Sequence, residues 1–419
     1  MEDAVRALRV NIDSGRLSSM GPYDCRLRSF FQGALGIAAT LAVMSGLCRE
    51  VLAQTAVSSG ISLPTASRIQ ASGWWPTKGD AARDEYVGAA KCAQCHAAKA
   101  RSWDTTAMAH AGTIASQSDI LRQHDHLTSQ IGSYGYQIVT GDDKSLMEVS
   151  HSDARSSDAL LWAFGLGHMG QTYLYQKDGL FYESHLSFFA TPQILDITPG
   201  QPRSVPTTLE QAAGRRMSPA ETRLCFGCHT TASTTKGHFD PTQLFPGVTC
   251  EACHGPGAKH VAAVKSGDGK LISESILNPE RLSPVDEVDF CGACHRTWED
   301  VVSNGSLGIG IFNVRFAPYR LENSRCWKEA GDARIACTAC HDPHKPLVKD
   351  AQSYDSNCLQ CHVASKTIKT TSDHPGRACP VSAKDCVTCH MPQYGPPNLH
   401  SAFTDHWIRI AERGEPYPN

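Results

Sequence analysis

Residues 250–260 read CEACHGPGAKH, and this stretch decides the fold. Cys250 and Cys253 are spaced one helical turn apart, and His254 follows them directly. A C-x-x-C pair alone is compatible with a zinc site, a redox dithiol, an iron–sulfur cluster or a disulfide. The added histidine makes the pattern that attaches a c-type haem, in which each thiol adds to a vinyl group and the imidazole ligates the iron.

The same pattern occurs seven times, and it uses fourteen of the 18 cysteines. Histidine is 19 of 419 residues, so chance placement after every pair has a probability on the order of 10⁻⁹. The sequence therefore predicts seven covalently bound c-type haems, numbered here in chain order, with iron as the bound metal. The predicted haem-linked cysteines and proximal histidines are Cys92, Cys95 and His96; Cys225, Cys228 and His229; Cys250, Cys253 and His254; Cys291, Cys294 and His295; Cys337, Cys340 and His341; Cys358, Cys361 and His362; and Cys386, Cys389 and His390.

The spacing of the motifs predicts the organisation of the chain. Six of the seven motifs crowd into residues 225–390, where too few residues remain to surround each porphyrin with aliphatic side chains. The haems themselves should form the core, in contact with one another. We therefore expect a mainly α and irregular multihaem cytochrome fold, with short helices and a small antiparallel β insertion. The expected segments are a signal peptide (1–53), a flexible leader (54–85), a first haem segment (86–130), the β-rich insertion (131–205) and a six-haem domain (206–410).

The haem-free insertion shows strand signals. Residues 172–177 and 180–188 are rich in aromatic residues, and Asp178-Gly179 between them predicts a two-residue hairpin turn. A second pair of short apolar runs flanks residues 141–143. The insertion could cover a haem face as a scaffold, or serve as a docking surface or a substrate lid.

The N-terminus predicts export. Arg26 and Arg28 precede an uncharged apolar run at residues 33–47, and small or branched residues precede a cleavage site after Ala53. An uncleaved membrane anchor is the alternative, but fifteen residues are short for a bilayer span. We expect a periplasmic or extracellular protein with no stable membrane span after cleavage.

Each iron has a sixth position, and twelve histidines outside the motifs are enough to fill all seven. His344 lies too close to His341 to reach the same iron, so it should ligate a neighbouring haem; His260, after the 255–257 turn, follows the same logic. The distal candidates are His110, Met108, His238, His260, His344, His374 and His406. Surface or supporting roles are the alternative for each, and they are favoured for His124, His126, His151, His168 and His185.

Four cysteines remain outside the motifs. Cys25 and Cys48 leave with the signal peptide, so Cys326 and Cys379 remain in an exported chain. A disulfide between them is the simplest expectation, with a thiolate ligand or an unlinked thiol as alternatives.

Three flanking stretches resemble a known family: Tyr86-Val87-Gly88 before the first motif with Trp103 after it, residues 247–260, and Cys389-His390-Met391-Pro392. They resemble the multihaem family of cytochrome c-552/4-like domains that includes the nitrifiers' tetrahaem electron-transfer cytochrome and its octahaem hydroxylamine-oxidising relatives. The resemblance covers most of residues 86–410 and implies a periplasmic electron carrier or a redox-enzyme subunit. The chain differs in haem number and in the β insertion. It also has no Cys-x-x-Cys-Lys motif, the active-site signature of pentahaem nitrite reductases, so catalytic activity is not carried over.

Three functions fit these observations. The first is an electron carrier along closely packed haems; the second is an oxidoreductase acting on a small nitrogen or sulfur compound at an open haem; the third is a subunit of an extracellular haem conduit or filament, which would self-associate. The net charge of −3 argues against nucleic acid, and 41% apolar residues exclude a polytopic membrane protein. Haem propionates add further negative charge, so redox partner proteins should present basic docking patches.

Overall fold

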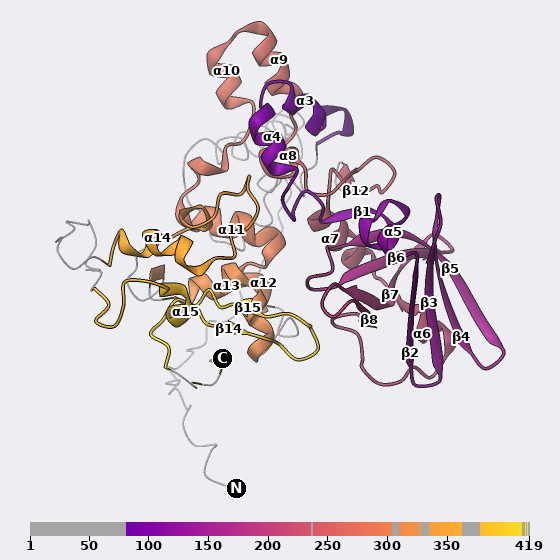
Figure 1. Cartoon of the computed structure of the whole chain (residues 1–419). Coiled ribbons are helices and arrows are strands. Elements are labelled where there is room, and N and C mark those ends of the chain that lie inside the picture. Colours follow the sequence, from indigo (N-terminus) through magenta and orange to yellow (C-terminus); the bar gives the residue numbers. More distant parts are fainter. Residues whose placement is uncertain are drawn as a thin grey trace, which may run out of the picture. The chain divides into compact units, whose positions relative to one another are not determined.

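The predicted hairpin is present in the computed structural model of the chain, which describes residues 81–235, 238–303, 310–324, 326–327, 335–362, 378–412, 415 and 417 (Figure 1). Strand β6 (Gln171–Lys177) pairs with β7 (Leu180–Phe189), with Lys177 opposite Leu180. Asp178 and Gly179 join them with φ of 51° and 75°. Two consecutive residues with positive φ are what a type I′ turn requires, so the hairpin prediction is confirmed.

This hairpin belongs to a nine-stranded antiparallel sheet with the order β2-β3-β4-β5-β6-β7-β8, in which β1 also pairs with β5 and β9 with β7. The sheet curls until its strands β2 and β8 come into contact. A hydrogen bond joins them, in which Ser129 Oγ of β2 donates to Leu195 O of β8 at 3.2 Å. The remaining strands are β1 (Gly112–Ile114), β2 (His126–Ile131), β3 (Tyr134–Thr140), β4 (Ser145–His151), β5 (Ala154–Phe164), β8 (Ile194–Ile197) and β9 (Gly214–Arg216).

The expectation of a mainly α fold is wrong, because this sheet spans Gly112–Arg216 and is the largest regular element among the described residues. The sequence shows strand signals for only part of this sheet. Strand β5 begins with exposed polar residues, and its buried positions lie mostly in its second half. Strand β2 buries only Leu127, so neither strand shows the apolar alternation that identifies a half-buried strand. The sheet extends beyond residues 131–205 at both ends.

Two apolar clusters hold the sheet. The larger one includes Tyr134, Tyr136, Ile138 and Met147, and helix α6 (Leu209–Ala213) packs against it through Ala212 and Ala213. The smaller one, on β5, β6 and β7, faces the second haem motif and is described below.

The part of the chain that carries the haem motifs has short helices, as expected. Only α7 and α11 are longer than ten residues, and the other strands are two residues long. The helices are α3 (Ala89–Ala93), α4 (Ala97–Trp103), α5 (Asp119–Gln123), α7 (Pro219–His229), α8 (Cys250–His254), α9 (Ala258–Ser266), α10 (Gly269–Glu274), α11 (Pro284–His295), α12 (Trp298–Ser303), α13 (Ala317–Glu322), α14 (Asp355–Leu359) and α15 (Cys386–His390), with 3₁₀ turns that include η7 (Cys337–Ala339) and η8 (Ala351–Tyr354).

Several predictions fall on residues that lie outside the described ones: the signal peptide at 1–53, most of the leader at 54–85, and His374. Within the described ranges, no helix combines the length and the apolar character needed to cross a bilayer.

Candidate functional site

All seven motifs lie on short helical turns. Four are wholly inside helices α7, α8, α11 and α15. In the other three, the backbone N–H of the histidine donates to the backbone carbonyl of the first cysteine. The distances are 2.9 Å from His96 to Cys92, 2.9 Å from His341 to Cys337 and 3.0 Å from His362 to Cys358. The two cysteines and the histidine of each motif therefore share one turn of chain, as attachment of a single porphyrin requires.

Backbone carbonyls orient several motif imidazoles. Nδ1 of His229 donates to Ala111 O at 2.7 Å, Nδ1 of His254 to Leu277 O at 2.8 Å, and Nδ1 of His390 to Arg409 O at 2.7 Å. A carbonyl only accepts, so Nδ1 carries the proton and Nε2 keeps its lone pair. This is the arrangement that supports a metal-ligating histidine.

Two of the distal candidates have the same arrangement. Nδ1 of His260 donates to Ile272 O at 2.9 Å, and Nδ1 of His406 donates to Thr404 O at 3.0 Å. His110 differs, because its Nε2 already contacts Asp104 O at 2.6 Å and its side chain is exposed.

Three motif histidines face a second histidine ring. Ring centres are 6.4 Å apart for His96 and His260, 6.0 Å for His254 and His344, and 6.3 Å for His341 and His406. A metal–imidazole bond is about 2.0 Å long and the ring centre lies about 1.1 Å beyond the nitrogen, so two axial imidazoles on one iron place their ring centres about 6 Å apart. All three pairs match that separation.

The histidines that face these three motif rings all follow another motif in the sequence. His260 lies on α9, which follows motif 3, yet it faces His96 of motif 1. His344 follows motif 5 but faces His254 of motif 3. His406 follows motif 7 and faces His341 of motif 5. The histidine sits beside another motif in each case, and for His260 and His344 the closeness to their own motif requires it.

Burial favours the neutral form of these imidazoles. It lowers the pKa of His229, of His295 and of His341, and it lowers the pKa of His406 to about 4. A neutral imidazole is the form that ligates a metal, so the environment and the donor set fit haem iron.

A buried ion pair fixes the C-terminal segment that carries His406. Arg320 is 1% exposed and Asp405 is 0% exposed, and the guanidinium donates from Nε to Oδ1 at 2.8 Å and from Nη2 to Oδ2 at 3.0 Å. Arg409 Nη1 adds a third bond to Asp405 at 2.9 Å, and Trp407 N–H a fourth at 3.0 Å. The sequence shows only scattered charges here, and nothing in it signals this network.

The sheet packs against motif 2. Phe226 of α7 is 0% exposed and makes edge contacts with Trp162, Phe164 and Phe181. Phe164 also stacks on the His229 ring, with centres 4.8 Å apart and an angle of 10°. With Ala111 O holding His229 Nδ1, strands β1 and β5 and the residues before them shape the surroundings of the second motif.

The other predicted ligands lie elsewhere. Met108 is half-buried and its carbonyl accepts from Val248 N–H, while His238 is exposed on the two-residue strand β12 (His238–Phe239). Five histidines pack within or beside the sheet: His124 on Phe188, His151 on Tyr134, His185 against Tyr136 and Gln201, His126 on Gln137, and His400 on Phe189 and Asp196.

The expected disulfide is absent: within the described residues, no bridge joins Cys326 to Cys379. Cys379 is exposed, and its sulfur instead accepts from Val381 N–H at 3.4 Å in a local turn.

Comparisons with known proteins point to the same class of protein as the motifs. A family model described as "Cytochrome c554 and c-prime" matches residues 203–255, which hold motifs 2 and 3. "Multiheme cytochrome MtrA" of Shewanella baltica (strain OS185) is 26% identical over 204 residues, which cover 45% of this chain and 52% of that protein. The chain thus matches about half the length of this curated relative. The solved structure of "Outer Cell Wall Cytochrome OcwA" aligns with a TM-score of 0.44 and 15% identity, over 78% of this chain and 80% of that one.

None of these three names describes a hydroxylamine-oxidising enzyme, so that part of the expected resemblance has no support here. What the motifs, their histidine geometry and the matched cytochromes support is a multihaem c-type cytochrome with covalently bound haems.

Proposed function

We propose that this chain is an exported seven-haem cytochrome that carries electrons along closely packed haems between redox partners. The observation that carries the proposal is the set of three histidine pairs at 6.0–6.4 Å, each matched to the span of two axial ligands on one iron. In this proposal, each motif binds one haem through its two cysteines and its histidine.

When bound, the haem iron supplies a one-electron change between the ferric and ferrous states. The chain's own histidines then decide what else can happen at the iron. With haem bound, a second histidine as ligand would favour a low potential and would leave no site for a substrate. His260, His344 and His406 are the proposed distal ligands of haems 1, 3 and 5.

Each proposed distal histidine follows one motif and serves the haem of another, and this predicts the order of the haems along the electron path. His260 is only six positions after His254, and His344 is three positions after His341. Haem 3 must therefore lie beside haem 1, and haem 5 beside haem 3. His406, in the segment after motif 7, links haem 7 to haem 5 over a longer stretch. We propose that electrons pass along the order 1–3–5–7.

The sheet fits the role of a scaffold that covers haem 2. It offers the stacked Phe164 and the Ala111 carbonyl to His229, and both contacts orient the ring. A cover of this kind would keep water away from a haem bound at motif 2.

Intact mass spectrometry of the purified protein tests the haem count, and electron paramagnetic resonance with carbon monoxide addition tests the carrier role. We expect seven covalent haems, low-spin ferric signals and no change when carbon monoxide meets the reduced protein. A high-spin iron that binds carbon monoxide would overturn the carrier assignment in favour of catalysis at an open haem. Nitrite, hydroxylamine and sulfur oxyanions would then be the substrates to test.

The charge of the chain predicts the chemistry of its partners. The formal net charge is −3 before the haem propionates are added, so donor and acceptor should dock through basic patches. Electron-transfer rates with a basic donor should fall as ionic strength rises. Rates that do not change with salt would contradict this docking mode.

A further inference from the structure

One haem-motif helix carries a buried carboxylate that binds the backbone of another motif. Glu251, inside motif 3, is 1% exposed. Its Oε2 accepts from Gly88 N–H at 2.8 Å, and its Oε1 accepts from Val87 N–H at 2.9 Å and Gly257 N–H at 2.8 Å. Gly88 is the N-cap of α3, the helix that carries Cys92 of motif 1. Glu251 thus joins the start of motif 1 to motif 3.

Asp355 makes the same kind of contact between motifs 6 and 7. It lies on α14, three residues before Cys358, and is buried. Its Oδ2 accepts from Asp385 N–H at 2.8 Å and its Oδ1 from Cys386 N–H at 2.9 Å. These two N–H groups are at the start of α15, where helical N–H groups lack internal partners.

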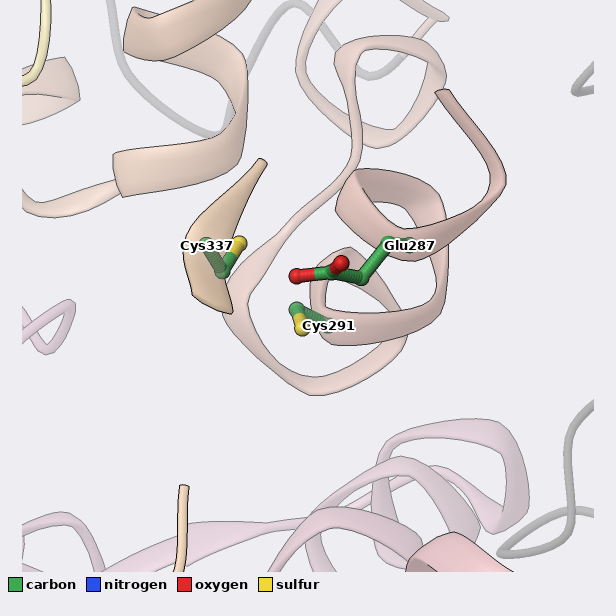
Figure 2. A group of neighbouring side chains, drawn as sticks. All are labelled: Glu287, Cys291 and Cys337. Carbon is green, nitrogen blue, oxygen red and sulfur yellow. The ribbon is translucent and has the colours of Figure 1, made fainter. Parts of the chain in front are cut away.

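Glu287 repeats the contact between motifs 4 and 5. It lies on α11, four residues before Cys291, and is 6% exposed. Its Oε1 accepts from Thr338 N–H at 2.8 Å and its Oε2 from Thr338 Oγ at 2.9 Å. Thr338 directly follows Cys337 of motif 5. Figure 2 shows Glu287 on its helix with Cys291 and Cys337 beside it.

The potential ligand atoms of Glu287, Cys291 and Cys337 lie within 4.8 Å of one another, a spacing that could hold a metal ion. A metal site is the weaker interpretation, because both carboxylate oxygens are already bonded to Thr338 and both sulfurs belong to haem motifs. The same three residues fit better as the place where two haem motifs meet.

The short helices and turns that carry the motifs pair in the same way as the carboxylates. Helix α3 contacts α8, the turn η7 contacts α11, and α14 contacts α15. These are motifs 1 and 3, 5 and 4, and 6 and 7. The carboxylate bonds and the contacts between the motif-bearing elements therefore assign the same three motif pairs.

We infer that Glu251, Glu287 and Asp355 are positioning residues that lock six haem motifs into three pairs, 1/3, 4/5 and 6/7. This inference rests on the proposed attachment of a haem at every motif. A carboxylate bonded to buried N–H groups makes charge-assisted bonds that are stronger and more directional than neutral ones. Motif 2 has no such partner among the contacts described above; it is held by the sheet through Ala111 and Phe164.

The acceptor pattern predicts different outcomes for the three amide variants. In Glu251→Gln and Asp355→Asn, the new NH₂ group faces a backbone N–H that cannot accept, so one motif-to-motif bond is lost. In Glu287→Gln, the NH₂ group faces Thr338 Oγ, and a hydroxyl can turn round and accept. Glu287→Gln should therefore keep the junction, although it removes the same charge.

Hydrogen exchange of the haem-loaded protein, read by mass spectrometry at single amides, tests this directly. We expect about tenfold faster exchange, or more, at Val87, Gly88 or Gly257 in Glu251→Gln, and at Asp385 or Cys386 in Asp355→Asn. Thr338 should stay protected in Glu287→Gln. Glu274→Gln, an exposed acid on α10, is the matched control and should change none of them.

A potentiometric titration of the same proteins gives a readout that separates positioning from general stability. Loss of a negative charge beside a motif should raise the midpoint potential of the haems in that pair in all three variants, including the well-folded Glu287→Gln, and leave Glu274→Gln at the wild-type value. Unchanged exchange and unchanged potentials in Glu251→Gln and Asp355→Asn would overturn the inference. Fewer than seven haems in the wild-type mass would count against the proposed function and not against this inference. Hydrogen exchange reports on the carboxylate bonds and does not depend on the number of haems.

Discussion

Replacing Asp405 by alanine should destabilise the protein by about 3–5 kcal/mol, the usual cost of leaving one member of a buried ion pair alone. Arg320, at 1% exposure, would lose both of its bonds to this carboxylate. Arg409 and the Trp407 N–H would lose one each. A loss of that size is a large part of the roughly 5–15 kcal/mol that stabilises a typical domain.

Asp405→Ala should also disturb two haem sites. Asp405 precedes His406, the proposed distal ligand of haem 5, and the Arg409 carbonyl holds Nδ1 of His390 in motif 7. Once the network is broken, we expect His406 to leave the iron in part of the molecules. Haem 5 should then show a high-spin ferric signal that is absent from the wild type.

Denaturant unfolding followed by circular dichroism measures the first effect, and electron paramagnetic resonance measures the second. Asp119→Asn is the control, because its ion pair with Arg122 is largely exposed and should contribute under about 1 kcal/mol. The double change Arg320→Met with Asp405→Leu should recover part of the stability, since Arg320 no longer remains as a buried charge and Arg409 keeps its bonds to Trp407 O and Tyr394 Oη. A loss below about 1 kcal/mol in Asp405→Ala, with every haem low-spin, would refute the reasoning.

Three further predictions concern single side chains. His260→Gly should open haem 1 and add one high-spin iron that binds carbon monoxide, whereas His124→Gly, whose ring packs on Phe188, should leave the spectrum unchanged. Phe226 is 0% exposed, so Phe226→Ala should lower the free energy of unfolding by about 3–5 kcal/mol in denaturant melts. A loss under about 1 kcal/mol would show that the aromatic cluster does not hold the sheet to motif 2. Gly247→Ala should lower the melting temperature more than Gly267→Ala: both glycines have φ of 73°, but a Cβ on Gly247 would overlap the Ala109 carbonyl oxygen, whereas Gly267 faces open space. Equal shifts would contradict that contact.

The sequence was most informative where chemistry demands fixed spacing. The seven motifs needed no structure to find, and the closeness of His344 to His341 already required that it serve another haem. The Asp178-Gly179 turn likewise identified its hairpin, because few sequences adopt two positive φ angles in a row.

Other features depend on residues that are far apart in the chain. The polar start of β5 gave no apolar alternation, so the size of the sheet was underestimated and the fold class was wrong. Glu251 could not be matched to Gly88, 163 positions away, nor Arg320 to Asp405, 85 positions away. The identity of the partner of His96 was equally beyond local patterns, since any of several histidines could reach an iron.

A crystal structure of the haem-loaded protein, with the irons located by their anomalous scattering, tests the central claim most directly. We predict seven irons per chain, with one between His96 and His260, one between His254 and His344, and one between His341 and His406. Fewer than seven irons at the motifs, or a different axial partner opposite these three histidines, would contradict the account of a crossed-ligand electron wire.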